Sequence, residues 1–205
     1  REGKLQPGFS MIHNSVAILK GNAPVEKNIR FYWNVGDGNK PTTLFEPHTP
    51  RTTTGDYYWL GDGFVNKALG GSTYIFAYRI RNVSNKDFGF AEVGNALIVL
   101  PAGSKPPYKL QRQIDTPLSL PGDSAGGSGS FGAGVFVNTK QAGAPQPDGY
   151  VYVYGVRGRA KMVMVARVQP KDFEHFKKWR FWDGRQWSAD INKAAAIASH
   201  ASNEL

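Results

Sequence analysis

The sequence carries one strand pattern twice. Each copy opens on a short segment with alternating glycines, Leu60–Gly63 in the first copy and Phe131–Gly134 in the second. An aromatic run and a further apolar run then follow in each copy, at Tyr74–Tyr78 and Ala96–Leu100, and at Tyr150–Tyr154 and Met162–Ala166. Because one such unit cannot bury its own apolar faces, the repeat predicts β units that are stacked or arranged radially.

Frequent turn residues and short apolar runs favour strands over helices. The chain of 205 residues contains 24 glycines and 13 prolines, and its apolar runs of about five to eight residues are typical of short strands joined by turns. We therefore predict an all-β fold, and more specifically a β-propeller of four-stranded blades.

The predicted blades span residues 11–50, 57–115 and 130–190, and residues 200–205 begin a further blade. About three blades are then present, whereas closed propellers have roughly four to eight. We expect residues 1–205 to form a single propeller domain that is incomplete at both ends.

Outside the repeats the sequence predicts a hairpin and one short helix. Apolar strands at residues 11–19 and 29–33 flank a polar turn, and a further strand is expected near residues 42–45. Residues 172–178 follow Pro170 and are expected to form the helix, because proline favours the first turn of a helix.

Charge and composition narrow the classes of partner. The formal net charge of +9 admits an acidic partner, but the basic residues are spread over turns and strands without a nucleic-acid-binding motif. We interpret them as solvated strand edges and predict no nucleic-acid partner. No apolar run approaches the roughly 20 residues of a membrane-spanning helix, so no membrane span is predicted.

The sequence predicts neither a metal site nor a cofactor. The chain has no cysteine, and His48, His175 and His200 lack the spacing of metal ligands. The glycine-rich segment at residues 121–129 lacks the Gly-Lys-Ser/Thr ending of a phosphate-binding loop. The sequence does not decide whether a structural calcium ion binds. We expect the protein to be a monomer.

Two acids are the candidate catalytic residues. Asp62 lies between two glycines at the start of a predicted inner strand, where a ligand or another backbone can come close. Glu204 has the equivalent place in the blade that begins at the C-terminus. Carboxylates on inner strands of different blades suit glycoside cleavage, which uses one acid and one base or nucleophile. The structural alternative for Asp62 is a turn aspartate that bonds its own backbone.

Five further residues are candidates for substrate binding. His13 and Asn14 open the first inner strand and could hydrogen-bond to sugar hydroxyls, although a structural pair fits equally well. Trp33, Tyr58 and Trp59 could stack on sugar rings, although such aromatic residues also fill the interfaces between blades.

Several short segments carry a family resemblance. They are Tyr58–Gly63, Tyr74–Phe76, Val165–Val168, Phe181–Gly184, Trp187–Ser188 and Asn203–Leu205. From about residue 11 to residue 205, the chain resembles bacterial five-bladed propellers of the endo-D-arabinanase type, which were first known only as domains of unknown function. The resemblance implies a fold similar to arabinanase and xylosidase propellers, five blades when complete, and a secreted carbohydrate-active protein. It also implies that Asp62 and Glu204 are carboxylates of the funnel, with His13 and Asn14 nearby.

The leading prediction is a propeller glycoside hydrolase that cleaves furanoside, arabinan-like linkages of a polysaccharide or oligosaccharide. Such a protein is expected to be secreted, periplasmic or on the cell surface. The alternative is a non-catalytic propeller that binds a glycan or a protein through its aromatic residues and basic surface. A nucleic-acid binder, which would show strongly salt-dependent binding, ranks last.

Overall fold

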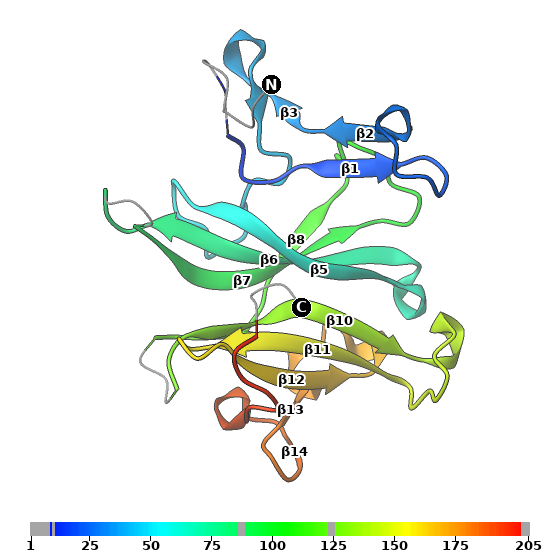
Figure 1. The fold of residues 1–205 in the computed structure, drawn as a ribbon, viewed down its shortest axis with the longest axis vertical. Helices are drawn as coiled ribbons and strands as arrows, with labels where there is room; N and C mark the ends of the chain where they lie inside the picture. The colour runs from blue at the N-terminus through cyan, green and yellow to red at the C-terminus, as the bar shows by residue number, and fades with distance from the viewer. Residues whose placement is uncertain (1–8, 10, 86–88, 123–125, 202–205) are drawn as a thin grey trace.

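The computed structural model describes residues 9, 11–85, 89–122 and 126–201. Within these residues the regular structure is β-strand and short 3-10 turns, so the predicted all-β class is confirmed. The strands form four antiparallel sheets that follow one another along the long axis of the molecule, from the N-terminal hairpins to β14 (Figure 1).

Two small hairpins come first. β1 (Val16–Leu19) pairs with β2 (Ile29–Tyr32), and β3 (Asn34–Val35) pairs with β4 (Pro41–Thr42). The predicted first hairpin is therefore present, but its first strand is shorter than residues 11–19.

The strand expected near residues 42–45 is present in part as β4, and the Asn14 side chain explains why it ends at Thr42 and why β1 begins only at Val16. Its Oδ1 accepts a hydrogen bond from Phe45 N–H at 2.8 Å, and its Nδ2 donates to the carbonyls of Phe45 and Tyr58. These side-chain bonds replace ladder bonds, so the chain near residues 14 and 45 is irregular.

Two larger sheets contain the repeat. One has the order β5-β6-β7-β8, and the other has the order β14-β13-β12-β11-β10-β9. Their strands are β5 (Tyr57–Asn66), β6 (Ser72–Asn82), β7 (Phe90–Leu100), β8 (Arg112–Asp115), β9 (Ser119–Leu120), β10 (Gly129–Asn138), β11 (Tyr150–Arg157), β12 (Met162–Val168), β13 (Arg180–Trp182) and β14 (Trp187–Ser188). The two copies of the pattern correspond to β5–β7 and β10–β12.

Both copies carry an irregularity at the same place. The register of β5 against β6 shifts between Leu60 and Gly63, and that of β10 against β11 shifts between Phe131 and Gly134. Glycine is required here because β5 and β10 come very close: a Cβ on Gly61 would lie 2.4 Å from the Gly132 carbonyl oxygen. The glycines therefore serve the approach of another backbone.

The main core fills the space between the two larger sheets. Its members include Phe76 and Leu97 from the first sheet and Phe131 and Val153 from the second, all buried. A second cluster, which includes Phe45 and buried residues of β5–β7, covers the opposite face of the first sheet. The first sheet therefore has buried side chains on both of its faces.

The predicted helix at residues 172–178 is wrong in its form. The segment contains two separate 3-10 turns, η5 (Pro170–Asp172) and η6 (Phe176–Lys178). The reason is that Phe173 and Trp179 both turn into the main core, where their rings lie 5.2 Å apart and Trp179 Nε1 donates to the Phe173 carbonyl. The remaining 3-10 turns are η1 (Glu26–Asn28), η2 (Asp37–Asn39), η3 (Lys67–Leu69), η4 (Lys140–Ala142) and η7 (Ile191–Lys193).

Candidate functional site

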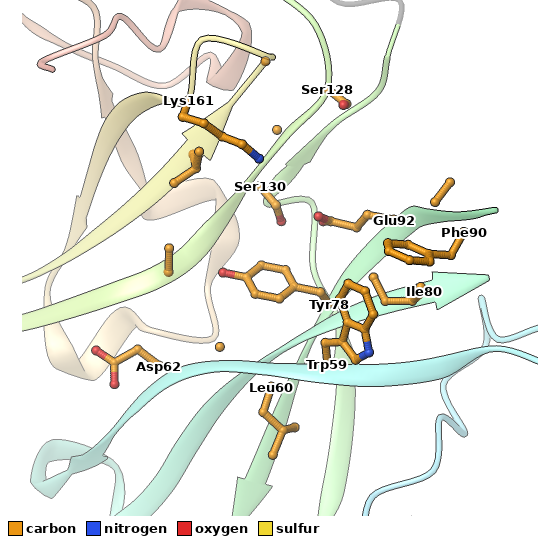
Figure 2. Close-up of a pocket in the computed structure, with 16 residues that line it drawn as sticks. Trp59, Leu60, Asp62, Tyr78, Ile80, Phe90, Glu92, Ser128, Ser130 and Lys161 are labelled. Atoms are coloured by element: carbon orange, nitrogen blue, oxygen red, sulfur yellow. The ribbon is translucent and has the colours of Figure 1, made fainter. Parts of the chain in front are cut away.

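A cavity of about 910 Å³ lies between the two larger sheets. Side chains from β5, β6 and β7 form one wall, and β10 with the turn between β11 and β12 forms the other (Figure 2). Its chemically distinctive lining residues are Trp59, Asp62, Tyr78, Phe90, Glu92, Ser128, Ser130 and Lys161. We call this cavity the inter-sheet pocket.

Asp62 lies at one end of the inter-sheet pocket (Figure 2). Its Oδ1 accepts a hydrogen bond from the N–H of Gly63, and its Oδ2 accepts one from Val135 of the neighbouring sheet, both at 2.7 Å. The side chain is otherwise exposed. The bond from Gly63 is the local backbone bond expected of a turn aspartate. Asp62 also faces the pocket, as expected of a site residue.

Glu92 of β7 is a second carboxylate in the same pocket, and sequence reasoning missed it. The residue as a whole is exposed, whereas its carboxyl group is crowded by protein atoms. This burial raises the pKa of Glu92 to about 7, although a hydrogen bond from Ser130 acts in the opposite direction. The crowding of the carboxyl group governs its protonation, because desolvation acts on the charged atoms.

A buried polar chain positions Ser130 beside Glu92. Thr116 Oγ1 donates to Asn95 Oδ1 at 2.9 Å, and Asn95 Nδ2 donates to Ser130 Oγ at 2.9 Å. All three side chains are buried. Ser130 Oγ accepts this bond from Asn95, donates weakly to the Leu118 carbonyl at 3.5 Å, and also bonds to the carboxyl group of Glu92.

Aromatic rings line the same pocket. Trp59 is 39% exposed and packs edge-to-face against Phe90, with ring centroids 4.8 Å apart. Figure 2 shows the Tyr78 ring between Asp62 and Glu92. A partly exposed tryptophan held by its neighbours can offer a flat apolar face to a ligand without a large loss of side-chain entropy.

Four of the other predicted site residues lie outside the inter-sheet pocket. Tyr58 is fully buried, and its hydroxyl donates a hydrogen bond to Gln113. Asn14 is 7% exposed, and its side chain forms the hydrogen bonds to the backbone of Phe45 and Tyr58 described above. Neither is accessible to a sugar, which corrects their assignment as binding residues. Trp33 is 44% exposed and lies between β2 and β3.

His13 lines a second, smaller cavity of about 580 Å³ together with Glu46 and Thr52–Tyr57. Its ring stacks on that of Tyr57 at 3.7 Å, and burial lowers the pKa of His13. The structure therefore brings Asp62 and Trp59 together and places His13 elsewhere. Glu204 lies outside the described residues.

The sequence contains only a weak indication of the pocket residues that were not predicted, such as Phe90 and Glu92. Phe90 and Glu92 alternate on β7, so their side chains share one face of the strand. An acid at such a position in an otherwise apolar run is the one feature that could have been noticed. The partners from β10 and the β11–β12 turn could not be assigned, because they meet β7 only through sheet packing.

Two further findings concern metals and membranes. Across residues 9, 11–85, 89–122 and 126–201, no three His, Asp or Glu side chains gather as a metal site requires. None of the helical segments in the same part of the chain has the length and apolar character needed to cross a membrane.

Comparison with known proteins gives a family. The sequence profile of a domain of unknown function, DUF5005, matches residues 4–205. No curated protein matches the chain. Since the match covers nearly the whole sequence, the chain belongs to the DUF5005 family.

Proposed function

We propose that the chain is a carbohydrate-active β-propeller protein that cleaves a furanoside, arabinan-like linkage in the inter-sheet pocket. The observation that carries the proposal is the presence of Asp62 and Glu92 in one cavity, next to an exposed tryptophan. The function rests on this cavity, because a fold alone does not define a reaction.

The propeller architecture is supported by the two larger sheets. Each is an antiparallel arrangement of consecutive strands, and the two face each other across the main core. The equivalent irregularities in β5 and β10 indicate that the sheets are repeats of one unit.

The two acids have environments suited to different roles. Glu92, whose pKa is raised to about 7, is protonated in about half of the molecules at neutral pH and would act as the general acid on the leaving oxygen. Asp62 is exposed and held by two backbone N–H groups, so it would act as the base or nucleophile. Trp59 would stack on the apolar face of the sugar ring.

The proposal is tested by release of reducing ends from D-arabinan, L-arabinan and xylan. Asp62→Asn and Glu92→Gln are expected to lower the rate at least a hundredfold, because general acid–base catalysis contributes roughly 10²–10⁴. Glu26→Gln, which changes an exposed acid far from the pocket, should leave the rate unchanged. Release that both pocket variants retain would refute the assignment.

A non-catalytic propeller that binds a glycan is the second candidate. It is favoured by the two backbone bonds of Asp62, since they give this carboxylate a structural role. Binding that survives both carboxylate substitutions but is lost in Trp59→Ala, with no reducing ends released, would support it.

A polysaccharide substrate also suggests a location. We propose that the protein acts as a monomer, without a cofactor, at the cell surface, in the periplasm or after secretion. Fractionation of cells with an antibody against the protein tests the location, and retention in the cytoplasm would contradict it.

A further inference from the structure

The sheet that contains β10–β14 carries a row of aromatic rings on the side turned away from the main core. This sheet forms the end of the molecule opposite the N-terminal hairpins (Figure 1). Along β11, Val151 and Val153 are buried in the main core, so Tyr150 and Tyr152, which alternate with them, lie on the other side. Cross-strand pairing places further rings beside these two. We call the whole set the aromatic face: Phe136, Tyr150, Tyr152, Trp182 and Trp187, with Arg167 among them.

The rings of the aromatic face lie against one another across the sheet. Tyr152 lies beside both Phe136 and Trp187, with ring centroids 6.5 Å and 6.0 Å apart. Trp187 in turn lies 5.4 Å from Trp182. Phe136 is 46% exposed, and the other rings are partly exposed. The row is therefore continuous from β10 to β14 and accessible from solvent along its length.

Arg167 of β12 holds three of these rings in place. Its guanidinium carbon lies 4.4 Å from the centre of the Tyr150 ring and 4.2 Å from that of the Trp187 ring. The same side chain forms a hydrogen bond with the hydroxyl group of Tyr152. Because these contacts restrict the rotation of the rings, a ligand that stacks on them loses little side-chain entropy.

The equivalent face of the first larger sheet is built differently. The irregularities of the two repeats align Ile75 of β6 with Tyr154 of β11, because each pairs with the glycine that follows the shift. Two residues earlier on these strands, the pairing aligns Leu100 with Arg167. Ile75 and Leu100 pack in the second cluster, which covers the first sheet. A charged side chain among aromatic rings replaces this apolar contact, so the aromatic face does not suit the packing of another apolar sheet.

The charged groups of the aromatic face are bound within the protein. Arg167 is held by the rings, and Asp148 accepts a hydrogen bond from the Tyr152 hydroxyl. Arg180, on the neighbouring strand, donates to two backbone carbonyls. The face thus offers flat rings bordered by polar groups rather than a concentration of one charge. Sugar rings have apolar C–H faces with hydroxyl groups at their edges, so an uncharged saccharide matches this surface. A nucleic acid requires cations for its phosphates.

We propose that the aromatic face is a glycan-binding surface on which the sugar rings of an uncharged saccharide chain stack. It is separate from the inter-sheet pocket, because none of its residues lines that cavity. Binding at this surface does not require the pocket to be catalytic. Its role is to hold a polysaccharide on the protein, with Arg167 as a positioning residue for the rings.

The test is affinity electrophoresis of the full chain in gels that contain L-arabinan, xylan or mixed-linkage β-glucan. At least one polymer should retard the protein. Trp187→Ala and Phe136→Ala should each weaken binding to that polymer about tenfold, which corresponds to the loss of one stacking contact. Trp187→Phe keeps a ring and should retain most of the binding.

Two controls accompany these variants. Phe31→Ala removes a ring that is 58% exposed on β2, outside the aromatic face, and should leave binding unchanged. Circular dichroism melting verifies that each variant is folded. If Trp187→Ala does not fold, Phe136→Ala still decides the result, because its side chain lies at an exposed position.

The outcomes separate this surface from the inter-sheet pocket. Binding that is lost in the variants of the aromatic face but survives Asp62→Asn and Trp59→Ala supports the proposal, even if no reducing ends are released. Binding that is lost only in Trp59→Ala belongs to the pocket and overturns the proposal. Failure of all three polymers to retard the protein also overturns it.

Two further measurements identify a different occupant. Binding of a single-stranded DNA oligonucleotide that depends on Trp187 and falls steeply with salt would assign the surface to a nucleic acid. A dimer in sedimentation that Trp187→Ala dissociates, without any glycan binding, would assign it to a second copy of the chain. Either result overturns the proposal.

Discussion

The carboxylate of Asp62 on β5 accepts a hydrogen bond from the backbone N–H of Val135 on β10, at 2.7 Å. A candidate catalytic acid therefore also connects the two larger sheets. The bond lies where both strands are irregular, next to the close contact between Gly61 and Gly132. Changes at this position are expected to affect stability as well as activity.

Replacing Asp62 with asparagine should lower the free energy of unfolding by about 1 kcal/mol. An amide has one acceptor oxygen, so it cannot satisfy both Gly63 N–H and Val135 N–H as the carboxylate does. Urea unfolding measures the loss, with Asp37→Asn at an exposed turn position as the control. Equal midpoints for the two variants would show that the bond to Val135 contributes no stability.

Glu92 should make the stability of the protein depend on pH near neutrality. Its pKa is raised by burial from 4.5 to about 7, so the folded state holds the proton more tightly than the unfolded state does. The stability present below pH 4.5 is therefore lost as the pH rises through about 7. Glu92→Gln should raise the melting temperature relative to the parent at pH 8 and leave it unchanged at pH 4. A gain of the same size at both pH values would contradict the raised pKa.

Ser130 should lower the pKa of the Glu92 carboxyl group. Its hydroxyl favours the charged form of Glu92, so Ser130→Ala should raise the pKa of this carboxyl further. If Glu92 acts as the general acid, the alkaline limit of hydrolysis moves to higher pH in this variant. The measurement is the pH profile of kcat/KM, and an unmoved or acid-shifted limit contradicts the expected role of Ser130.

Gly61 should tolerate no side chain. A Cβ there would lie 2.4 Å from the Gly132 carbonyl oxygen and 3.2 Å from Phe76 Cβ, so Gly61→Ala must push the two sheets apart locally. We expect a loss of about 1–3 kcal/mol in the free energy of unfolding. Gly122→Ala, whose Cβ would meet nothing within 4 Å, is the matched control. Similar unfolding midpoints for both variants would show that the sheets are less closely packed than described.

Two arginine–aspartate ion pairs should determine how the stability of the fold falls at acidic pH. Arg79 Nη1 pairs with Asp115 at 2.7 Å, and Asp56 bonds to Arg81 at 2.6 Å. The hydrogen bond from Arg81 lowers the pKa of Asp56. Burial alone would raise the pKa of Asp115, but hydrogen bonds from Thr49 and Arg79 outweigh it and lower the pKa.

Both carboxylates therefore stabilise the fold above their ordinary pKa, near 3.9, and this stability is lost as the pH falls below that value. Arg79→Met should cost about 3–5 kcal/mol at pH 7, because it leaves the largely buried carboxylate of Asp115 without its cation. Guanidinium unfolding at pH 7 and pH 3 measures both effects. A variant as stable as the parent at pH 7, or the same loss at both pH values, would contradict the ionic role.

Much of the fold follows from local sequence. The repeated glycine and aromatic segments predict β5–β7 and β10–β12, since alternation and turn residues act over a few positions. The two 3-10 turns around Phe173 were not predictable in this way. Their form depends on where the side chains of Phe173 and Trp179 pack in the main core. Local sequence preferences do not predict this position.

The site was only partly predictable for the same reason. Asp62 stood out because two glycines flank it, and Trp59 lies close by on the same strand. Asn14 and Tyr58 had equally suitable side chains, but packing buries both. Exposure is decided by which sheet covers which face, so residue type alone could not separate Trp59 from Tyr58.

The all-β class, the internal repeat and the position of Asp62 beside its glycines follow from local sequence, because each depends on residues close together along the chain. The contact of Glu92 on β7 with Ser130 on β10, and the pocket that both share with Lys161, arise only when the sheets pack. These groups are brought together by the packing of two sheets around a common core, which hydrophobic burial drives without specifying polar neighbours in advance.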